Sequence, residues 1–295
     1  MDRPLTGVTV VSLAVNLPGP AAAHRFHRLG ASVTKVEPPS GDPLALAAPG
    51  YYAHFTDGQQ TVTLNLKDEA GRRELDGYLR NADLLITSHR PRALAGLGLD
   101  WDTLHVRYPQ LSQVAIVGSE GNDADTPGHD LTYQAQAGTI AVSGGVPVMP
   151  ILPVADLGGA ERAVADGLAA LFRARMSGEG QFRETGLAQV VDDFAASTRF
   201  GLSGSGAVLG GGFPLYGMYP ARDGYIAVAA IEPHFAVALA EAMGLESPLE
   251  VTVDQLTDFF REHSVDYWSR WALEHELPVT GVRDGQTGDG QTTRR

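Results

Sequence analysis

The sequence contains no cysteine among its 295 residues, which excludes disulfide bonds, thiolate metal ligands and cysteine nucleophiles together. Basic residues are also scarce, with 22 Lys and Arg against 35 Asp and Glu and a formal net charge of −13. Because no dense basic run is present, the composition argues against nucleic acid and against an anionic membrane surface as partners. An anionic ligand would need a local basic pocket.

Long hydrophobic runs are missing as well. No apolar segment approaches the roughly 18 residues of a membrane span, and the first residues lack the pattern of a secretory leader. We therefore expect no membrane span, no signal peptide and a cytoplasmic location. The hydrophobic content of 43% is nevertheless enough for a sizeable core, in one large domain with a smaller companion.

Short aliphatic and β-branched runs alternate with helical patterns through the first half of the chain. Strands are predicted at residues 8–13, 32–37, 62–66, 84–87 and 114–117. A helix over about 21–29 completes a βαβ unit, which predicts a parallel sheet with a right-handed crossover. The continued alternation predicts an α/β fold with a Rossmann-like, doubly wound parallel sheet. No G-x-G-x-x-G follows the first strand, so nothing supports a dinucleotide site.

A glycine- and serine-rich stretch at residues 201–212 is predicted to be a linker. It separates a large Rossmann-like domain over 1–200 from a second, smaller α/β domain over 213–282. Residues 283–295 carry no apolar face, and we expect them to form a disordered tail.

Residues that can transfer protons stand where helices are expected to begin. His129 follows Gly128, and Asp156 follows Pro153-Val154-Ala155; an imidazole and a carboxylate suit acid–base chemistry on carbon. Glu232, between a predicted strand and a predicted helix, is a third candidate. Each also has a structural interpretation: His129 as a loop residue, Asp156 as a helix cap and Glu232 as half of a helix-opening Glu-Pro pair.

Three further polar residues, His89, Arg90 and Arg92, lie just past the predicted strand 84–87. Open α/β sheets bind ligands at this carboxyl edge, so the segment is a candidate binding site. The alternative for Arg90 is a solvated loop charge.

Motifs spread from Leu5 to about Val282 form an ordered series. It includes Leu17-Pro18-Gly19-Pro20, Lys35-Val36-Glu37-Pro38-Pro39, Leu64-Asn65-Leu66-Lys67, Gly128-His129-Asp130 and Pro153-Val154-Ala155-Asp156. Taken together, this series resembles the class III CoA-transferases of the CaiB/BaiF type and, within them, the α-methylacyl-CoA racemases. The resemblance implies a Rossmann-type large domain, a small α/β domain and an interlocked homodimer.

The resemblance also implies a reaction. In the transferases the Asp of Pro-Val-Ala-Asp is a nucleophile that carries the acyl group, whereas in the racemases it is one of two bases. His129 and Glu232 match the racemases, so we predict racemisation or epimerisation of 2-methylacyl-CoA thioesters through an enolate. His129 and Asp156 would act on opposite faces, Glu232 would hold the imidazole, and the backbone N–H of Asp156 would stabilise the enolate oxygen.

The CoA part of the substrate would be held by Lys35, Arg90 and Tyr133, with no metal and no other cofactor. Gln59 and Gln60 stand where the resembled family carries a basic residue, which predicts weaker CoA binding. Two alternatives stay open. One is an acyl-CoA:carboxylate CoA-transferase with Asp156 as nucleophile, and the other is a repurposed member that acts without CoA.

The chain ends soon after Thr280, whereas the resembled family continues with a segment that packs on the large domain. We expect a shortened member whose exposed surface is covered by a second copy, which gives a homodimer. Trp268 and Trp271, in a predicted aromatic helix, are candidates for burial at that contact.

Overall fold

A computed structural model describes residues 3–283, which form two compact units that meet in sequence between Ala195 and Ala196. The glycine-rich stretch 201–212 belongs to the second unit and holds a short 3-10 helix, Val208–Gly210. The predicted disordered tail lies outside the described residues, apart from Arg283.

The first unit is built on a six-stranded parallel sheet in the order β3-β2-β1-β4-β5-β8. The strands are β1 (Thr9–Ser12), β2 (Ser32–Glu37), β3 (Gln60–Thr63), β4 (Leu84–Thr87), β5 (Ser112–Val117) and β8 (Phe182–Gly186). The order runs outward from β1 in one direction and from β4 in the other, as in Rossmann-like sheets. The predicted fold class is confirmed, with β8 as a strand that the sequence patterns did not reveal.

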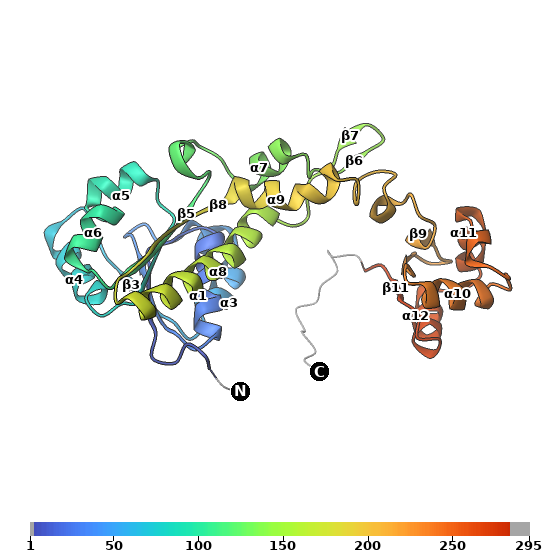
Figure 1. The fold of residues 1–295 in the computed structure, drawn as a ribbon, viewed down its shortest axis with the longest axis horizontal. Helices are drawn as coiled ribbons and strands as arrows, with labels where there is room; N and C mark the ends of the chain where they lie inside the picture. Colours follow the sequence, from blue (N-terminus) through green and yellow to red (C-terminus); the bar gives the residue numbers. More distant parts are fainter. Residues whose placement is uncertain (1–2, 284–295) are drawn as a thin grey trace. The chain divides into compact units, whose positions relative to one another are not determined.

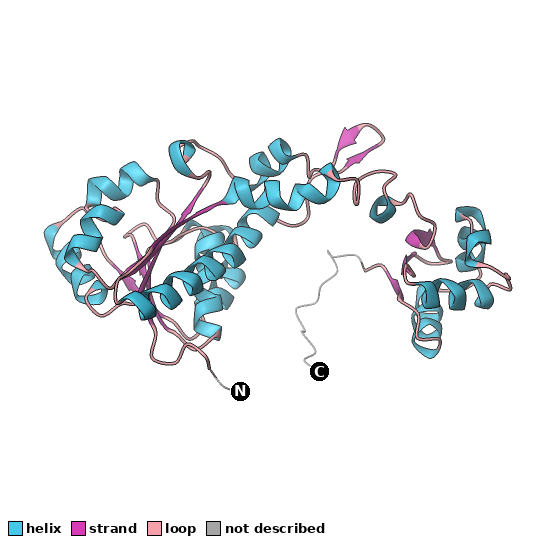
Figure 2. Cartoon of the chain, in the orientation of Figure 1, coloured by secondary structure: helices cyan, strands magenta, loops and turns pink. Residues whose placement is uncertain are grey.

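Helices cover both faces of this sheet (Figures 1 and 2). One face packs against α1 (Pro18–Arg28), α3 (Pro49–Thr56) and α8 (Val154–Ser177), in a core that includes Val10, Phe26 and Ile86. The other face packs against α4 (Glu69–Leu79), α5 (Pro91–Leu97) and α6 (Trp101–Arg107), around Leu75 and Leu85. Because both faces are covered, every residue of the central strands β4 and β5 is buried, whereas the edge strand β3 has none.

Helix α8 lies unusually close to its neighbours because three glycines face them. A Cβ atom added at Gly167 would lie 2.6 Å from the Phe26 ring, and one at Gly159 would lie 2.1 Å from Leu187 Cδ2. At Gly158 the added atom would meet Phe194 at 2.6 Å. Side chains at these positions would push the helix away from the core, so the glycines fix where α8 lies.

The remaining elements of the first unit are short or surround the sheet's carboxyl edge. They are α2 (Pro43–Ala47), α7 (Asp130–Ala137), the hairpin of β6 (Val142–Ser143) and β7 (Val146–Pro147), the 3-10 helix Gly121–Asp123, and most of α9 (Leu187–Arg199). α7 also packs against α8, and these two helices carry the predicted catalytic pair at their starts.

The second unit has a three-stranded antiparallel sheet in the order β11-β10-β9, together with helices. Its elements are β9 (Tyr216–Pro220), β10 (Tyr225–Ala229), α10 (Pro233–Ala242), the 3-10 helix Pro248–Glu250, α11 (Val253–Arg261), α12 (Val265–Glu274) and β11 (Val279–Gly281). Trp268 is only 2% exposed, and its Nε1–H donates to the Phe260 carbonyl at 2.7 Å. The prediction that Trp268 is buried by a second copy is therefore wrong, because it is a core residue of its own unit.

Among residues 3–283, no helix has both the length and the apolar character needed to cross a membrane.

Candidate active site

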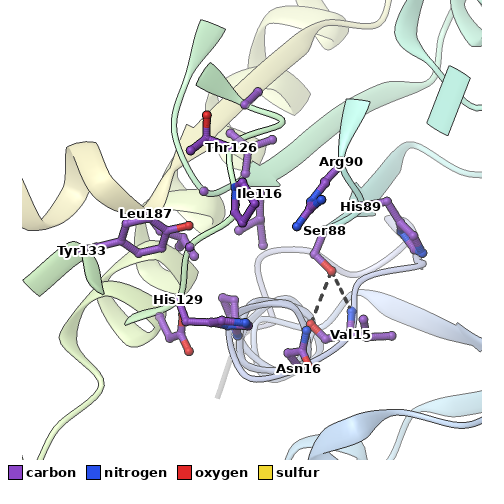
Figure 3. Close-up of a pocket in the computed structure, with 17 residues that line it drawn as sticks. Val15, Asn16, Ser88, His89, Arg90, Ile116, Thr126, His129, Tyr133 and Leu187 are labelled. Carbon is purple, nitrogen blue, oxygen red and sulfur yellow. Dashed lines mark hydrogen bonds between the residues drawn. The ribbon is translucent and has the colours of Figure 1, made fainter. Parts of the chain in front are cut away.

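A pocket of about 260 Å³ opens at the carboxyl edge of the parallel sheet (Figure 3). Its lining comes from the segments after three strands: Val15 and Asn16 after β1, Ser88 to Arg90 after β4, and Gly118 with Thr126 to His129 after β5. Tyr133 from α7, Asp156 from α8 and Leu187 from α9 also line it. Since the strand order reverses between β1 and β4, the pocket occupies the topological switch point where doubly wound sheets bind ligands.

The loop after β1 is held in a strained shape by two hydrogen bonds. Asn16 has φ of 65°, in the left-handed region that residues with a Cβ rarely adopt. Its backbone N–H donates to Asp42 Oδ1 at 3.0 Å, and the Val15 N–H donates to Ser88 Oγ at 2.9 Å. Figure 3 shows the contact between Ser88 and Val15. These two hydrogen bonds attach the loop after β1, which forms one wall of the pocket, to Ser88 after β4 and to Asp42.

Lys35 lies behind this wall and does not reach the pocket. It is 0% exposed, and its Nζ donates to Asp42 Oδ2 at 2.7 Å and to the Ala14 carbonyl at 3.1 Å, with Glu37 Oε1 at 3.5 Å. The prediction that Lys35 binds the CoA phosphates is wrong, because its charge is already neutralised by buried carboxylates. Its role is structural: it holds Asp42, which in turn holds Asn16.

His129 stands at the N-cap of α7 with an extended backbone, φ −143° and ψ 166°. Its backbone N–H donates to Thr132 Oγ1 at 3.0 Å, which fixes the start of the helix. The His129 side chain is exposed. Figure 3 shows His129 and Tyr133 entering from one side of the pocket, and Ser88, His89 and Arg90 from the other.

Asp156 is in the first turn of α8, as expected. Burial raises the pKa of its carboxyl group to about 6, the charge of Asp130 adds to the rise, and His129 opposes it. A carboxyl group that titrates near neutral pH can both accept and donate a proton there.

The carboxylate of Asp130 ties the first turns of α7 and α8 together. One oxygen accepts from the backbone N–H groups of Ala155 at 2.7 Å and of Asp156 at 3.2 Å. The other accepts from Gln134 Nε2 at 2.6 Å, and Gln134 also donates to the Leu152 carbonyl at 3.1 Å. Asp130 thereby sets the spacing of His129 and Asp156, although in the sequence it stands out only as part of the Gly128-His129-Asp130 motif.

This contact corrects the predicted oxyanion donor. The backbone N–H of Asp156 already donates to Asp130, so it is not free for an enolate oxygen. By contrast, within the described residues the N–H groups of Asp130 and Leu131, in the first turn of α7, have no hydrogen-bond acceptor. First-turn N–H groups lack helical partners and favour negative charge, so these two are the better donors.

Tyr133 is 6% exposed and lines the same pocket. Its hydroxyl oxygen lies so close to the backbone that a Cβ added at Gly128 or Gly118 would be 2.4 or 2.3 Å away. The glycine before His129 is therefore needed for this ring. Burial raises the pKa of Tyr133, and the nearby Asp156 adds to the rise, so the hydroxyl stays protonated and can donate.

The structure thus brings four of the six predicted site residues to one pocket: His129, Asp156, Arg90 and Tyr133. Glu232 lies in the second unit at the N-cap of α10, and its side chain does not cap that helix. Its catalytic role stays a prediction. No three His, Asp or Glu side chains of the described segment are grouped so that they could hold a metal ion.

A second cavity of about 780 Å³ opens beside this pocket in the first unit. Its lining is mostly apolar and includes Leu13, Val36, Pro38, Pro39, Leu64, Leu66, Ala93 and Leu97. Lys67 and Arg92 supply two positive charges, whereas neither Gln59 nor Gln60 lines it. Gln59 instead donates from Nε2 to the Phe55 carbonyl at 2.6 Å. The position of Lys67, just past β3, is the sequence signal that points to this second cavity.

A doubly wound sheet with an imidazole and a carboxyl group at its switch point defines an α/β protein suited to proton transfer or acyl transfer on a bound ligand. The chain belongs to CoA-transferase family III, whose sequence profile matches residues 5–287.

The chain is similar to relatives of two kinds. It is 35% identical to cinnamoyl-CoA:phenyllactate CoA-transferase of Clostridium sporogenes over 192 residues, which is 59% of this chain and 47% of that protein. It is 31% identical to α-methylacyl-CoA racemase of Mus musculus over 257 residues, 82% of this chain and 65% of that protein. The chain therefore spans about half to two thirds of the length of these relatives.

The fold is similar to that of solved structures. A CaiB/BaiF family protein from Brucella suis matches with a TM-score of 0.81 at 23% identity, covering 96% of this chain and 85% of that one.

Proposed function

We propose that this chain acts on acyl-CoA thioesters and transfers the proton on the carbon next to the thioester carbonyl, as an α-methylacyl-CoA racemase or epimerase. The observation that carries this proposal is that His129 and Asp156 line one pocket, where the pKa of Asp156 is raised to about 6. A two-base reaction needs each group to act as base in one direction and as acid in the other, and the raised pKa of Asp156 lets its carboxyl group do both near neutral pH.

The α-proton of a thioester is weakly acidic, so its removal needs a base together with stabilisation of the enolate oxygen. In our proposal His129 serves one face of the carbon and Asp156 the other. The backbone N–H groups of Asp130 and Leu131 donate to the enolate oxygen at the positive end of α7. The Asp130 carboxylate keeps the two helix starts in register.

The second cavity suits the nucleotide end of CoA. Its apolar lining offers a surface for a flat base, and Lys67 and Arg92 can neutralise phosphate oxygens. In this arrangement Lys67 and Arg92 supply the positive charge that is absent at Gln59 and Gln60, and so offset the weaker CoA binding predicted from the two glutamines.

A second candidate function is CoA transfer between carboxylates, favoured by the similarity to cinnamoyl-CoA:phenyllactate CoA-transferase. Here the Asp156 carboxylate would attack the thioester carbonyl, form a mixed anhydride and release the CoA thiolate. His129 would then have no required part in the chemistry.

Deuterium exchange distinguishes the two reactions. We expect the chain to exchange the α-hydrogen of 2-methylbutanoyl-CoA in D₂O, as followed by NMR. His129→Gln and Asp156→Asn should each lower racemisation by about 10² to 10⁴, as loss of a general acid or base does. If His129→Gln retains full activity and hydroxylamine traps an acyl group on Asp156, the transferase is correct. If calorimetry detects no binding of CoA or acyl-CoA, both proposals fail and a CoA-independent member remains.

A further inference from the structure

The pocket at the switch point and the larger cavity beside it share one lining residue, His89. It directly follows Ser88, whose hydroxyl holds the β1 loop, and it precedes Arg90 at the start of α5. A ligand long enough to occupy both cavities must pass this side chain. His89 is therefore placed to contact the part of such a ligand that joins its two ends.

The two nitrogens of the His89 ring have different surroundings. Nδ1 is sealed from solvent and has no hydrogen-bond partner among the described residues. Nε2 is not sealed, and no described residue bonds to it, so it faces open space. Buried N–H groups without partners are rarer than buried acceptors without partners. The arrangement therefore favours the neutral tautomer with a bare Nδ1 and a proton on Nε2.

The ring's charge state agrees with this assignment. Burial lowers the pKa of His89, and no charged partner opposes the effect. A second proton would have to sit on the sealed Nδ1 without an acceptor. At neutral pH the His89 side chain is thus an uncharged donor, unlike Lys67 and Arg92 in the larger cavity.

We propose that His89 donates from Nε2 to an amide carbonyl in the linker that joins the thioester to the nucleotide of CoA, and so selects thioesters that carry this linker. This inference rests on the proposed function. An uncharged donor suits a neutral acceptor, and the linker offers amide carbonyls between the reacting end in the smaller pocket and the phosphates near Lys67 and Arg92. The role is one of specificity, since His89 does not touch the reacting carbon.

The test compares two substrates and three variants. His89→Phe keeps a ring but removes the donor, whereas His89→Gln keeps an N–H donor at a similar reach. His105→Phe is the matched control, because His105 also has a buried Nδ1 without a partner but lines neither cavity. The substrates are 2-methylbutanoyl-CoA and the S-ethyl thioester of the same acid, which has no linker amide.

We expect His89→Phe to raise KM for the acyl-CoA and the calorimetric Kd for CoA by about 5-fold, the effect of one neutral hydrogen bond. kcat should stay unchanged, as should kcat/KM for the S-ethyl thioester. His89→Gln should stay within about 2-fold of the parent, and His105→Phe should match it. Equal Kd values for the parent and His89→Phe, or an equal loss with both substrates, would overturn the inference.

The same titration separates this inference from the proposed function. If the parent chain binds CoA but shows no exchange of the α-hydrogen, racemisation fails while the His89 contact is still judged by the Kd values. If the parent binds CoA and both His89 variants bind it equally well, only the His89 contact fails. No binding by the parent would refute both.

Discussion

At the scale of single residues, the surroundings of Asp156 change its acid–base chemistry. Its carboxyl group is partly buried beside Asp130, and its pKa is raised to about 6 from an ordinary value of 3.8. A raised pKa means that the folded chain holds the proton more tightly than the unfolded chain does. The stability that this group contributes is therefore complete below pH 3.8 and is lost as the pH rises through about 6.

Asp156→Asn should consequently change stability in a pH-dependent way. At pH 3.5 the variant and the parent should have similar Tm values, because Asp156 is mostly protonated in both the folded and the unfolded parent. At pH 8 the variant should be more stable by about 1 to 2 kcal/mol, after allowance for partial solvent exposure. Calorimetric Tm values at the two pH values test this, with the exposed Asp102→Asn as control. A difference that does not grow between pH 3.5 and pH 8 would contradict the environment described for Asp156.

At this scale, motifs predict residues that lie together where they fix both the residue and its place at an element end. His129, Asp156, Arg90 and Tyr133 line one pocket in the structure, and their roles stay predictions. Sequence reasoning reaches no further than such motifs. It failed for Lys35, because a charged residue in a strand looks alike in sequence whether it faces a ligand or a buried carboxylate. Asp130 is not singled out by the sequence because two of its three donors are backbone N–H groups, which carry no sequence signal.

Among the elements, the loop after β1 depends most on a buried ion pair. Asp42 is 1% exposed and accepts from Lys35 Nζ and from the backbone N–H groups of Asn16 and Leu44. Removing the carboxylate would leave the Lys35 charge buried without its closest partner and would release Asn16 from its strained conformation. The wall of the pocket and the stability of the unit therefore depend on the same side chain.

Asp42→Ala should lower the free energy of unfolding by about 3 to 5 kcal/mol, as breaking a buried ion pair does. Glu69→Ala is the matched control, since it breaks the exposed ion pair with Arg73 at 2.7 Å and should cost no more than about 0.5 kcal/mol. Urea denaturation of both variants gives the comparison. Similar losses for the two would show that the Lys35 and Asp42 pair does not hold the loop.

Periodicity predicted the central elements well and the peripheral ones poorly. Residues 32–37 and 84–87 match the observed bounds of β2 and β4, because each carries β-branched or aliphatic residues between turn-forming residues. β8, at Phe182–Gly186, escaped notice because an edge strand needs few apolar residues and its sequence is mostly polar.

At the scale of the whole molecule, the first unit exposes a cluster of large apolar side chains around its β6–β7 hairpin. Val142 is 63% exposed, Val146 64%, Met149 71%, Ile151 92% and Leu152 60%. Soluble monomers rarely leave contiguous apolar patches of this kind uncovered. We propose that a second copy of the chain covers this cluster, in a homodimer.

Light scattering should accordingly give twice the mass of one chain at micromolar concentration. Met149→Asp combined with Ile151→Asp should shift the mass to that of a monomer, because two charges would be buried at the contact. Leu46→Asp is the control, since Leu46 is 83% exposed on α2, outside the cluster. Trp268→Ala should instead unfold the second unit. A parent chain that scatters as a monomer would rule out the dimer.

The glycine contacts of α8 bear on how new activities could be selected from this scaffold. Gly158, Gly159 and Gly167 leave no room for side chains, so almost any change along that face would be lost to misfolding before function could be tested. Helix α7 has only eight residues, and Leu131 on it is 41% exposed. Leu131 takes no part in the tie between α7 and α8 that the Asp130 carboxylate makes. A library directed at this one position would therefore vary the start of α7 while Asp156 stays where it is.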